Sequence, residues 1–220
     1  MSTLQLQLRH ARLWPKSFGV AAGLLLFAAA SSATTFTFNT DPFAGIPNPP
    51  PVIQGEPSIN FNPATDSFAF NPSAFSFANN IQFANNTIEN LPVANVNAIV
   101  LQTLDNDKNP ATPFGARQAA ELIGAHVTTP GPGVFIYFNS TLQLDRLVFS
   151  TNLTDPNANL AVLARFPNLS GQTGISALPS FSSANFTATP EPSTLLLMGI
   201  AGSLLVLVNF NLALKPENNT

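Results

Sequence analysis

The sequence predicts a mainly β domain, an antiparallel sheet or sandwich with one α-helix near residues 113–126. Apolar residues two positions apart recur between residues 58 and 88, which places each pair on one face of a strand. The 220 residues include 19 phenylalanines but one tyrosine and one tryptophan, and phenylalanine mostly fills cores. Within the predicted domain, residues 113–126 combine helix-forming residues with helical spacing.

The first 33 residues match a secretory signal peptide. A basic stretch at residues 9–16 precedes the apolar run Phe18–Ala30, and small residues follow as far as Ala33. The apolar run is shorter than the roughly 20 residues that span a bilayer as a helix. We therefore expect cleavage between Ala33 and Thr34 rather than a permanent anchor.

Residues 34–57 are expected to form a proline-rich N-terminal segment, because proline removes a backbone donor and favours extended loops. Within it, Thr34–Phe38 alternates as a short strand would. Residues 58–170 are the predicted β-rich domain. Asparagine- and proline-containing turns separate its first apolar pairs, which predicts four short strands in an antiparallel meander over residues 58–88.

The predicted helix has recognisable start signals. Thr112 can cap it and Pro113 suits its first position. Further along, Ala119, Ile123 and His126 fall on one face.

Further strands are predicted on both sides of this helix. Val93–Leu104 precedes it, while Val134–Phe138 and Leu142–Ser150 follow it as a hairpin. Asn159–Phe166 is a further candidate. Residues 171–189 are rich in Ser, Thr and Pro and lose the alternation, so we expect a spacer there.

The charge and cysteine content exclude some functions. The segment 34–189 has few bases, so it offers no clustered basic surface for nucleic acid. The chain has no cysteine, so export does not bring a disulfide framework.

Two groups of residues are candidates for chemistry. His126 is the one histidine of the mature segment, and without a partner motif it favours a structural role over a zinc or hydrolase site. Asp105, Asp107 and Asn109 place oxygen ligands at alternate positions, as the first half of a calcium loop does. A solvated turn is the competing interpretation, because Pro110 and Ala116 replace the glycine and the carboxylate of a full calcium loop.

A short motif joined to an apolar stretch occupies residues 190–214. The uncharged run Leu195–Val208, extended to Leu214, gives about 30 Å of helix, the thickness of a hydrocarbon core. The residues that precede this run are Pro190, Glu191, Pro192, Ser193 and Thr194.

This arrangement resembles the PEP-CTERM family of sorting tails, in which Pro-Glu-Pro, usually with Ser-Thr, precedes an apolar span and a basic cluster. Residues 215–220 form the tail, in which Lys215 stands where the family has several arginines. The middle of the chain, from Gly115 to Arg165, resembles uncharacterised exported members of that family.

The resemblance implies processing by an exosortase, a membrane enzyme of bacteria that often produce exopolysaccharide. The C-terminal helix would anchor the chain in the inner membrane before processing, and the product would reach the cell surface or the extracellular space. We thus expect a non-catalytic cell-surface or extracellular-matrix protein of biofilms. The alternative is an envelope module that binds polysaccharide or calcium, and an exported hydrolase ranks third.

Overall fold

Two β-sheets and two α-helices make up the part of the chain that the computed structural model describes, residues 32–109 and 111–189. The fold is mixed α/β. The predicted signal peptide, apart from its last two residues, and the predicted C-terminal transmembrane helix lie outside the described residues. Within residues 32–109 and 111–189, no helix has both the length and the apolar character needed to cross a membrane.

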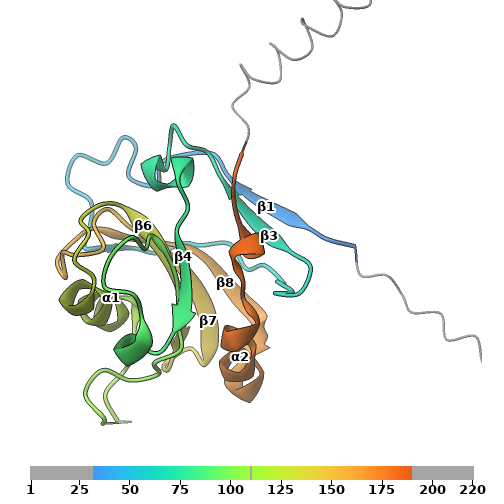
Figure 1. Ribbon diagram of the computed structural model, residues 1–220, viewed down its shortest axis with the longest axis vertical. Helices are drawn as coiled ribbons and strands as arrows, with labels where there is room; N and C mark the ends of the chain where they lie inside the picture. The colour runs from blue at the N-terminus through green and yellow to red at the C-terminus, as the bar shows by residue number, and fades with distance from the viewer. Residues whose placement is uncertain (1–31, 110, 190–220) are drawn as a thin grey trace, which may run out of the picture. The chain divides into compact units, whose positions relative to one another are not determined.

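The larger sheet has six strands in the order β2-β8-β7-β6-β5-β4 (Figure 1). β6, β7 and β8 pair antiparallel, whereas β2, β4 and β5 join by parallel pairing. The strands are β2 (Val52–Ile53), β4 (Phe83–Asn86), β5 (Ala98–Leu101), β6 (Gly133–Asn139), β7 (Leu144–Ser150) and β8 (Leu160–Ser170).

The smaller sheet consists of three parallel strands, β1 (Thr35–Phe38), β3 (Ser67–Phe70) and β9 (Phe186–Ala188). β3 lies in the middle and pairs with β1 on one side and β9 on the other. The first and last strands of the described chain therefore flank the same central strand.

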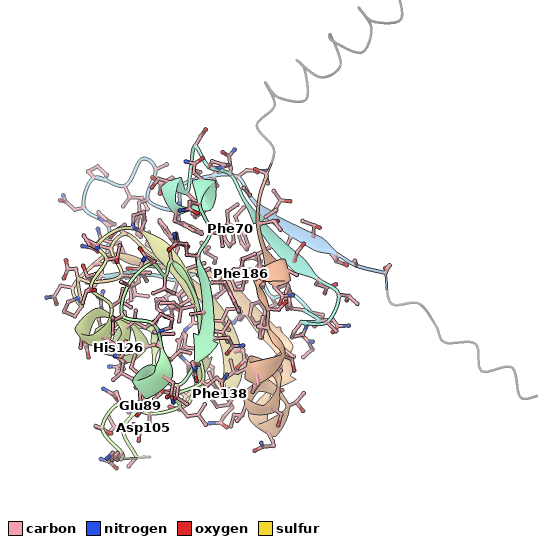
Figure 2. All side chains as sticks on the ribbon, in the orientation of Figure 1. Phe70, Glu89, Asp105, His126, Phe138 and Phe186 are labelled. Atoms are coloured by element: carbon pink, nitrogen blue, oxygen red, sulfur yellow. The ribbon has the colours of Figure 1, made fainter. Side chains whose placement is uncertain are left out.

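The larger sheet lies between two hydrophobic clusters. The first fills the space between the two sheets and is dominated by phenylalanine rings, with Phe70, Phe138 and Phe186 among them (Figure 2). Phe61 is at its centre and is fully buried, with its ring centroid 4.1 Å from that of Phe68 and 5.4 Å from that of Phe181. Stacked rings contribute beyond their buried area, which suits a domain with no disulfide.

α1 (Ala116–His126) lies on the other face of the larger sheet (Figure 1). The second cluster packs between this helix and the sheet. The helix buries Ala119 and Ile123 on the predicted face. It begins after the expected start, because the backbone N–H of Phe114 donates to Ser140 Oγ at 2.7 Å and the Phe114 ring is buried against Tyr137. These contacts hold Phe114 outside the helix.

The predicted antiparallel meander over residues 58–88 is wrong. Strands β3 and β4 belong to different sheets, and Phe77 lies in the 3-10 helix η1 (Ser76–Asn79). Five members of the apolar pairs are buried (Phe61, Phe68, Phe70, Phe75 and Phe77), but the strands that pair with β3 and β4 are not the neighbours that a meander requires. Spacing of two shows which residues share a face and does not show which strand pairs with which.

The hairpin was predicted correctly: β6 and β7 pair antiparallel over their whole lengths. Val93–Leu104 contains β5, whose four residues are all buried. Asn159–Phe166 begins β8, which continues to Ser170.

Residues 171–189 are folded instead of forming the expected spacer. They contain α2 (Gly171–Ala177), two 3-10 helices, η3 (Leu178–Ser180) and η4 (Ser183–Asn185), and strand β9. Leu178, Phe181 and Phe186 are at most 4% exposed and belong to the cluster between the sheets.

The proline-rich segment 34–57 also belongs to the domain, through β1 and β2. The folded region thus extends beyond both predicted boundaries, 58 and 170. The remaining 3-10 helix is η2 (Ile88–Asn90).

Candidate functional site

The predicted sorting residues Pro190–Thr194 lie outside the described residues. The predicted signal-cleavage residues, Ala33 and Thr34, are exposed and come directly before β1. The backbone nitrogen of Thr34 donates to Asp66 Oδ1 at 3.0 Å.

The predicted calcium residues lie in the loop between β5 and α1, and their side-chain oxygens turn back onto the backbone. Asp105 Oδ1 accepts from the N–H of Asp107 at 3.3 Å, and Asp107 Oδ1 from that of Asn109 at 2.9 Å. Asn109 Oδ1 accepts from the N–H of Ala111 at 3.2 Å. Such turns form without a metal, and the described residues contain no cluster of three His, Asp or Glu side chains. Calcium binding stays a prediction.

His126 is half-buried at the end of α1, on the side of the molecule shown at the left of Figure 2. Its Nε2 lies 2.7 Å from the carbonyl oxygen of Leu91. A carbonyl only accepts, so Nε2 carries the proton and fixes α1 to the segment before β5. This bond supports the structural interpretation of the histidine.

A buried ion pair joins β7 to the loop after β2. Arg146 Nη2 donates to Glu56 Oε1 at 2.5 Å and to Gln54 Oε1 at 2.6 Å, and the charged side chains are 4% and 5% exposed. Burial alone would raise the pKa of Glu56. Bonds from the backbone N–H groups of Glu56 and Gly55, together with the Arg146 guanidinium, hold the pKa below its ordinary value instead. Both partners are engaged within the fold, which indicates a structural role.

Asp145 is a second buried charge site, on the opposite face of β7. It is fully buried between Phe138 and Phe166 in the strand ladder, and neither carboxyl oxygen has a hydrogen-bond partner among the described residues. Burial raises the pKa of Asp145 to about 8, so the carboxyl is mostly protonated at neutral pH. A β-carbon on Gly174 of α2 would lie 3.2 Å from its Oδ1, so α2 packs directly over it.

A pocket rich in amide side chains lies where three parallel strands begin. It has a volume of about 360 Å³ and lies beside the first residues of β4, β5 and β6. Proline rings at positions 130 and 132 form part of its wall. The side chains that characterise it are five amides, Asn79, Asn80, Gln82, Asn95 and Asn97.

Asn97 holds this pocket together. Its Oδ1 accepts from the N–H of Gln82 at 2.8 Å, and its Nδ2 donates to the carbonyl of Asn80 at 2.7 Å. Its own carbonyl accepts from the N–H of Val134 at 2.8 Å. One side chain and its backbone therefore tie the starts of β4, β5 and β6 to each other.

Three of the other amides are free to bind a ligand. The side chains of Asn80, Gln82 and Asn95 form no hydrogen bond with any residue in the described ranges. Each amide offers two donors and an acceptor. The residues around the pocket include no acid, histidine, lysine or arginine, so it suits a neutral ligand rich in hydroxyl groups and has no group for acid–base catalysis.

The sequence contained these amides but did not identify them as a site. Asn79-Asn80 is one of the asparagine-containing turn signals between the apolar pairs, and nothing in the sequence distinguishes Gln82, Asn95 and Asn97 from other polar residues. An amide directly precedes β4 (Gln82) and β5 (Asn97), and this pattern becomes meaningful only once these two strands are known to be parallel neighbours. Comparison of the chain with known proteins found no matching family model, no matching curated protein and no matching solved structure.

Proposed function

We propose that this chain is an exported, exosortase-sorted bacterial protein that acts without catalysis at the cell surface or in the extracellular matrix of a biofilm. The N-terminal signal pattern and the PEP-CTERM-like tail suggest this route. The observation that best supports it is the extent of the fold: β1 begins at Thr35 and β9 ends at Ala188. The folded domain therefore fills the segment between the two proposed processing points, Ala33–Thr34 and the tripeptide at Pro190.

Intact-mass analysis with membrane fractionation of the native protein tests this proposal. We expect a chain that begins at Thr34, ends near residues 189–192 and is released from the inner membrane. A product that keeps its C-terminal run and stays in the membrane would mean that the tail is an anchor and would refute exosortase processing. Retention of residues 1–33 would refute the signal peptide.

A second candidate, binding of neutral polysaccharide, is favoured by the amide pocket. Unpaired amides beside proline rings match the alternating hydroxyl and C–H surface of a sugar. The proposed partner is the exopolysaccharide of the bacterium that produces the protein. The pocket has no aromatic platform of tryptophan or tyrosine, so hydrogen bonds would carry most of the specificity.

The amides can be removed without disturbing the backbone. Asn80→Ala and Gln82→Ala delete side chains that form no bond within the described fold, and Asn95→Gly keeps a residue suited to its φ of 57°. In pull-down assays with neutral polysaccharides, we expect the triple variant to bind at least about tenfold more weakly, a loss of two or three hydrogen bonds. Asn157→Ala, in an exposed turn, is the matched control. Equal binding by the triple variant would rule out this pocket.

A further inference from the structure

The three parallel strands of the smaller sheet all begin around one residue, Asp66. Thr34 precedes β1, Asp66 precedes β3 and Asn185 precedes β9. Asp66 Oδ1 accepts from the backbone nitrogen of Thr34 at 3.0 Å. The backbone carbonyl of Asp66 accepts from Asn185 Nδ2 at 2.7 Å. The N–H of Ser67 in turn donates to the carbonyl of Thr34 at 2.9 Å.

The Asp66 carboxylate is held in place by hydrogen bonds that do not involve Thr34. Asp66 is 7% exposed. Oδ2 accepts from the N–H of Asn62 at 2.9 Å, and Oδ1 also accepts from the Thr65 hydroxyl at 3.1 Å. All of these donors are neutral, and within the described ranges Asp66 has no salt bridge. Strands β1, β3 and β9 contain no acidic or basic side chain, so no other charge in this sheet faces the carboxylate.

We infer that signal-peptide removal creates the cationic partner of Asp66, so that Asp66 is the binding site for the α-ammonium group of the mature N-terminus. The inference depends on the proposed cleavage between Ala33 and Thr34. Hydrolysis breaks that peptide bond: water supplies the second oxygen of the Ala33 carboxylate, and the Thr34 nitrogen becomes an ammonium group. The same nitrogen that donated as a neutral amide then donates as a cation.

The conversion strengthens an existing contact and needs little movement. Hydrogen bonds with an ionised donor and acceptor are roughly twice as strong as neutral ones. Cleavage two residues earlier would leave Thr34 as an amide and would place the new charge outside the site. Among the possible mature chains, the one that begins at Thr34 therefore places its ammonium group on Asp66.

The competing explanation is that Asp66 only caps the turn Asn62–Asp66, whose ends are also joined by the N–H of Asp66 and the carbonyl of Asn62 at 2.8 Å. In that case the state of the Thr34 nitrogen would not matter. The two explanations differ in whether the effect of Asp66→Asn depends on where the chain begins.

A comparison of two chain starts decides between them. Both hydrophobic clusters lie within residues 36–186, so a chain of residues 34–189 contains all of the core that the structure describes. We would compare 34–189, released from a fusion with a native Thr34 amine, with 32–189, in which that nitrogen is an amide. Asp66→Asn is introduced into both chains, and Asp41→Asn, at an exposed turn, is the control.

At pH 6.5, we expect Asp66→Asn to raise the unfolding equilibrium constant about five- to tenfold more in 34–189 than in 32–189. The difference should shrink as the pH rises through the folded-state pKa of the amine and should disappear above about pH 10.5, where the amine is neutral. Equal effects in both chains would overturn the inference and leave Asp66 as a turn cap.

A second measurement uses the wild-type chain, so it can be made even if Asp66→Asn does not fold. The pKa of the Thr34 amine in 34–189, followed by NMR after isotopic labelling of the amine, should lie at least about one unit above the usual 7.7–8.0. An amine that titrates in the usual range would refute the ion pair. N-terminal sequencing of the exported protein tests the cleavage site separately, because the ion pair in 34–189 does not depend on export.

Discussion

The buried carboxyl of Asp145 should make the domain less stable as the pH rises. Burial raises the pKa of Asp145 from 3.8 to about 8, so in the folded state the group keeps its proton over a range where the unfolded chain has lost it. Between these two values the folded state binds the extra proton, and its stability therefore falls with increasing pH. Each pKa unit corresponds to about 1.4 kcal/mol, which gives roughly 3–4 kcal/mol lost between pH 5 and pH 8.

Asp145→Asn keeps the shape of the side chain and removes its titration. Urea unfolding of residues 34–189 at a series of pH values from 5 to 9 measures the effect. The stability of the variant relative to wild type should increase by roughly 3–4 kcal/mol between pH 5 and pH 8. Asp155→Asn, in an exposed turn, is the control for loss of one negative charge. If the free energies of unfolding of wild type and Asp145→Asn changed with pH in the same way, the reasoning would be refuted. Such a result would show that the ionised carboxylate is stabilised by water or by a partner.

Three further changes test the packing and the calcium loop. Arg146→Ala should cost about 3–5 kcal/mol in urea unfolding, because it leaves the Glu56 carboxylate buried without its cation. Gly174→Ala should lower the melting temperature by several degrees, since its β-carbon would lie 2.5 Å from a backbone carbonyl oxygen of residue 169; an unchanged melting temperature would argue against close packing of α2. If the loop binds calcium, added calcium should raise the melting temperature of wild type but not of a variant with Asp105→Ala and Asp107→Ala; a curve unaffected by calcium or chelator in wild type would remove the site.

Local signals were sufficient for the hairpin and the main helix. β6 and β7 are joined by residues 140–143, and the side chain of Asn139, the last residue of β6, closes that turn by accepting from the N–H groups of Thr141 and Leu142 at 3.1 and 2.8 Å. The turn chemistry and the apolar pattern are both visible in a short window of sequence. Pairing between adjacent strands follows from them.

The sheet order depends on contacts that no short window contains. Thr35 pairs with Ser67, and Phe68 pairs with Phe186, so the smaller sheet is assembled from three distant segments. Residues 171–189 were misinterpreted for a related reason: their Ser, Thr and Pro content is that of a spacer, and Phe181 and Phe186 stand out only when their partners are known. The amide pocket could not be predicted for the same reason, because its residues come from separate segments of the chain.

The last described strand reaches the proposed sorting motif without a spacer. The N–H of Thr189 donates to the carbonyl of Phe70 at 2.9 Å, extending the pairing of β9 with β3 by one residue. Pro190, the first residue of the proposed motif, follows directly in the sequence. If an exosortase processes this motif, it would therefore have to act directly at the edge of the folded domain.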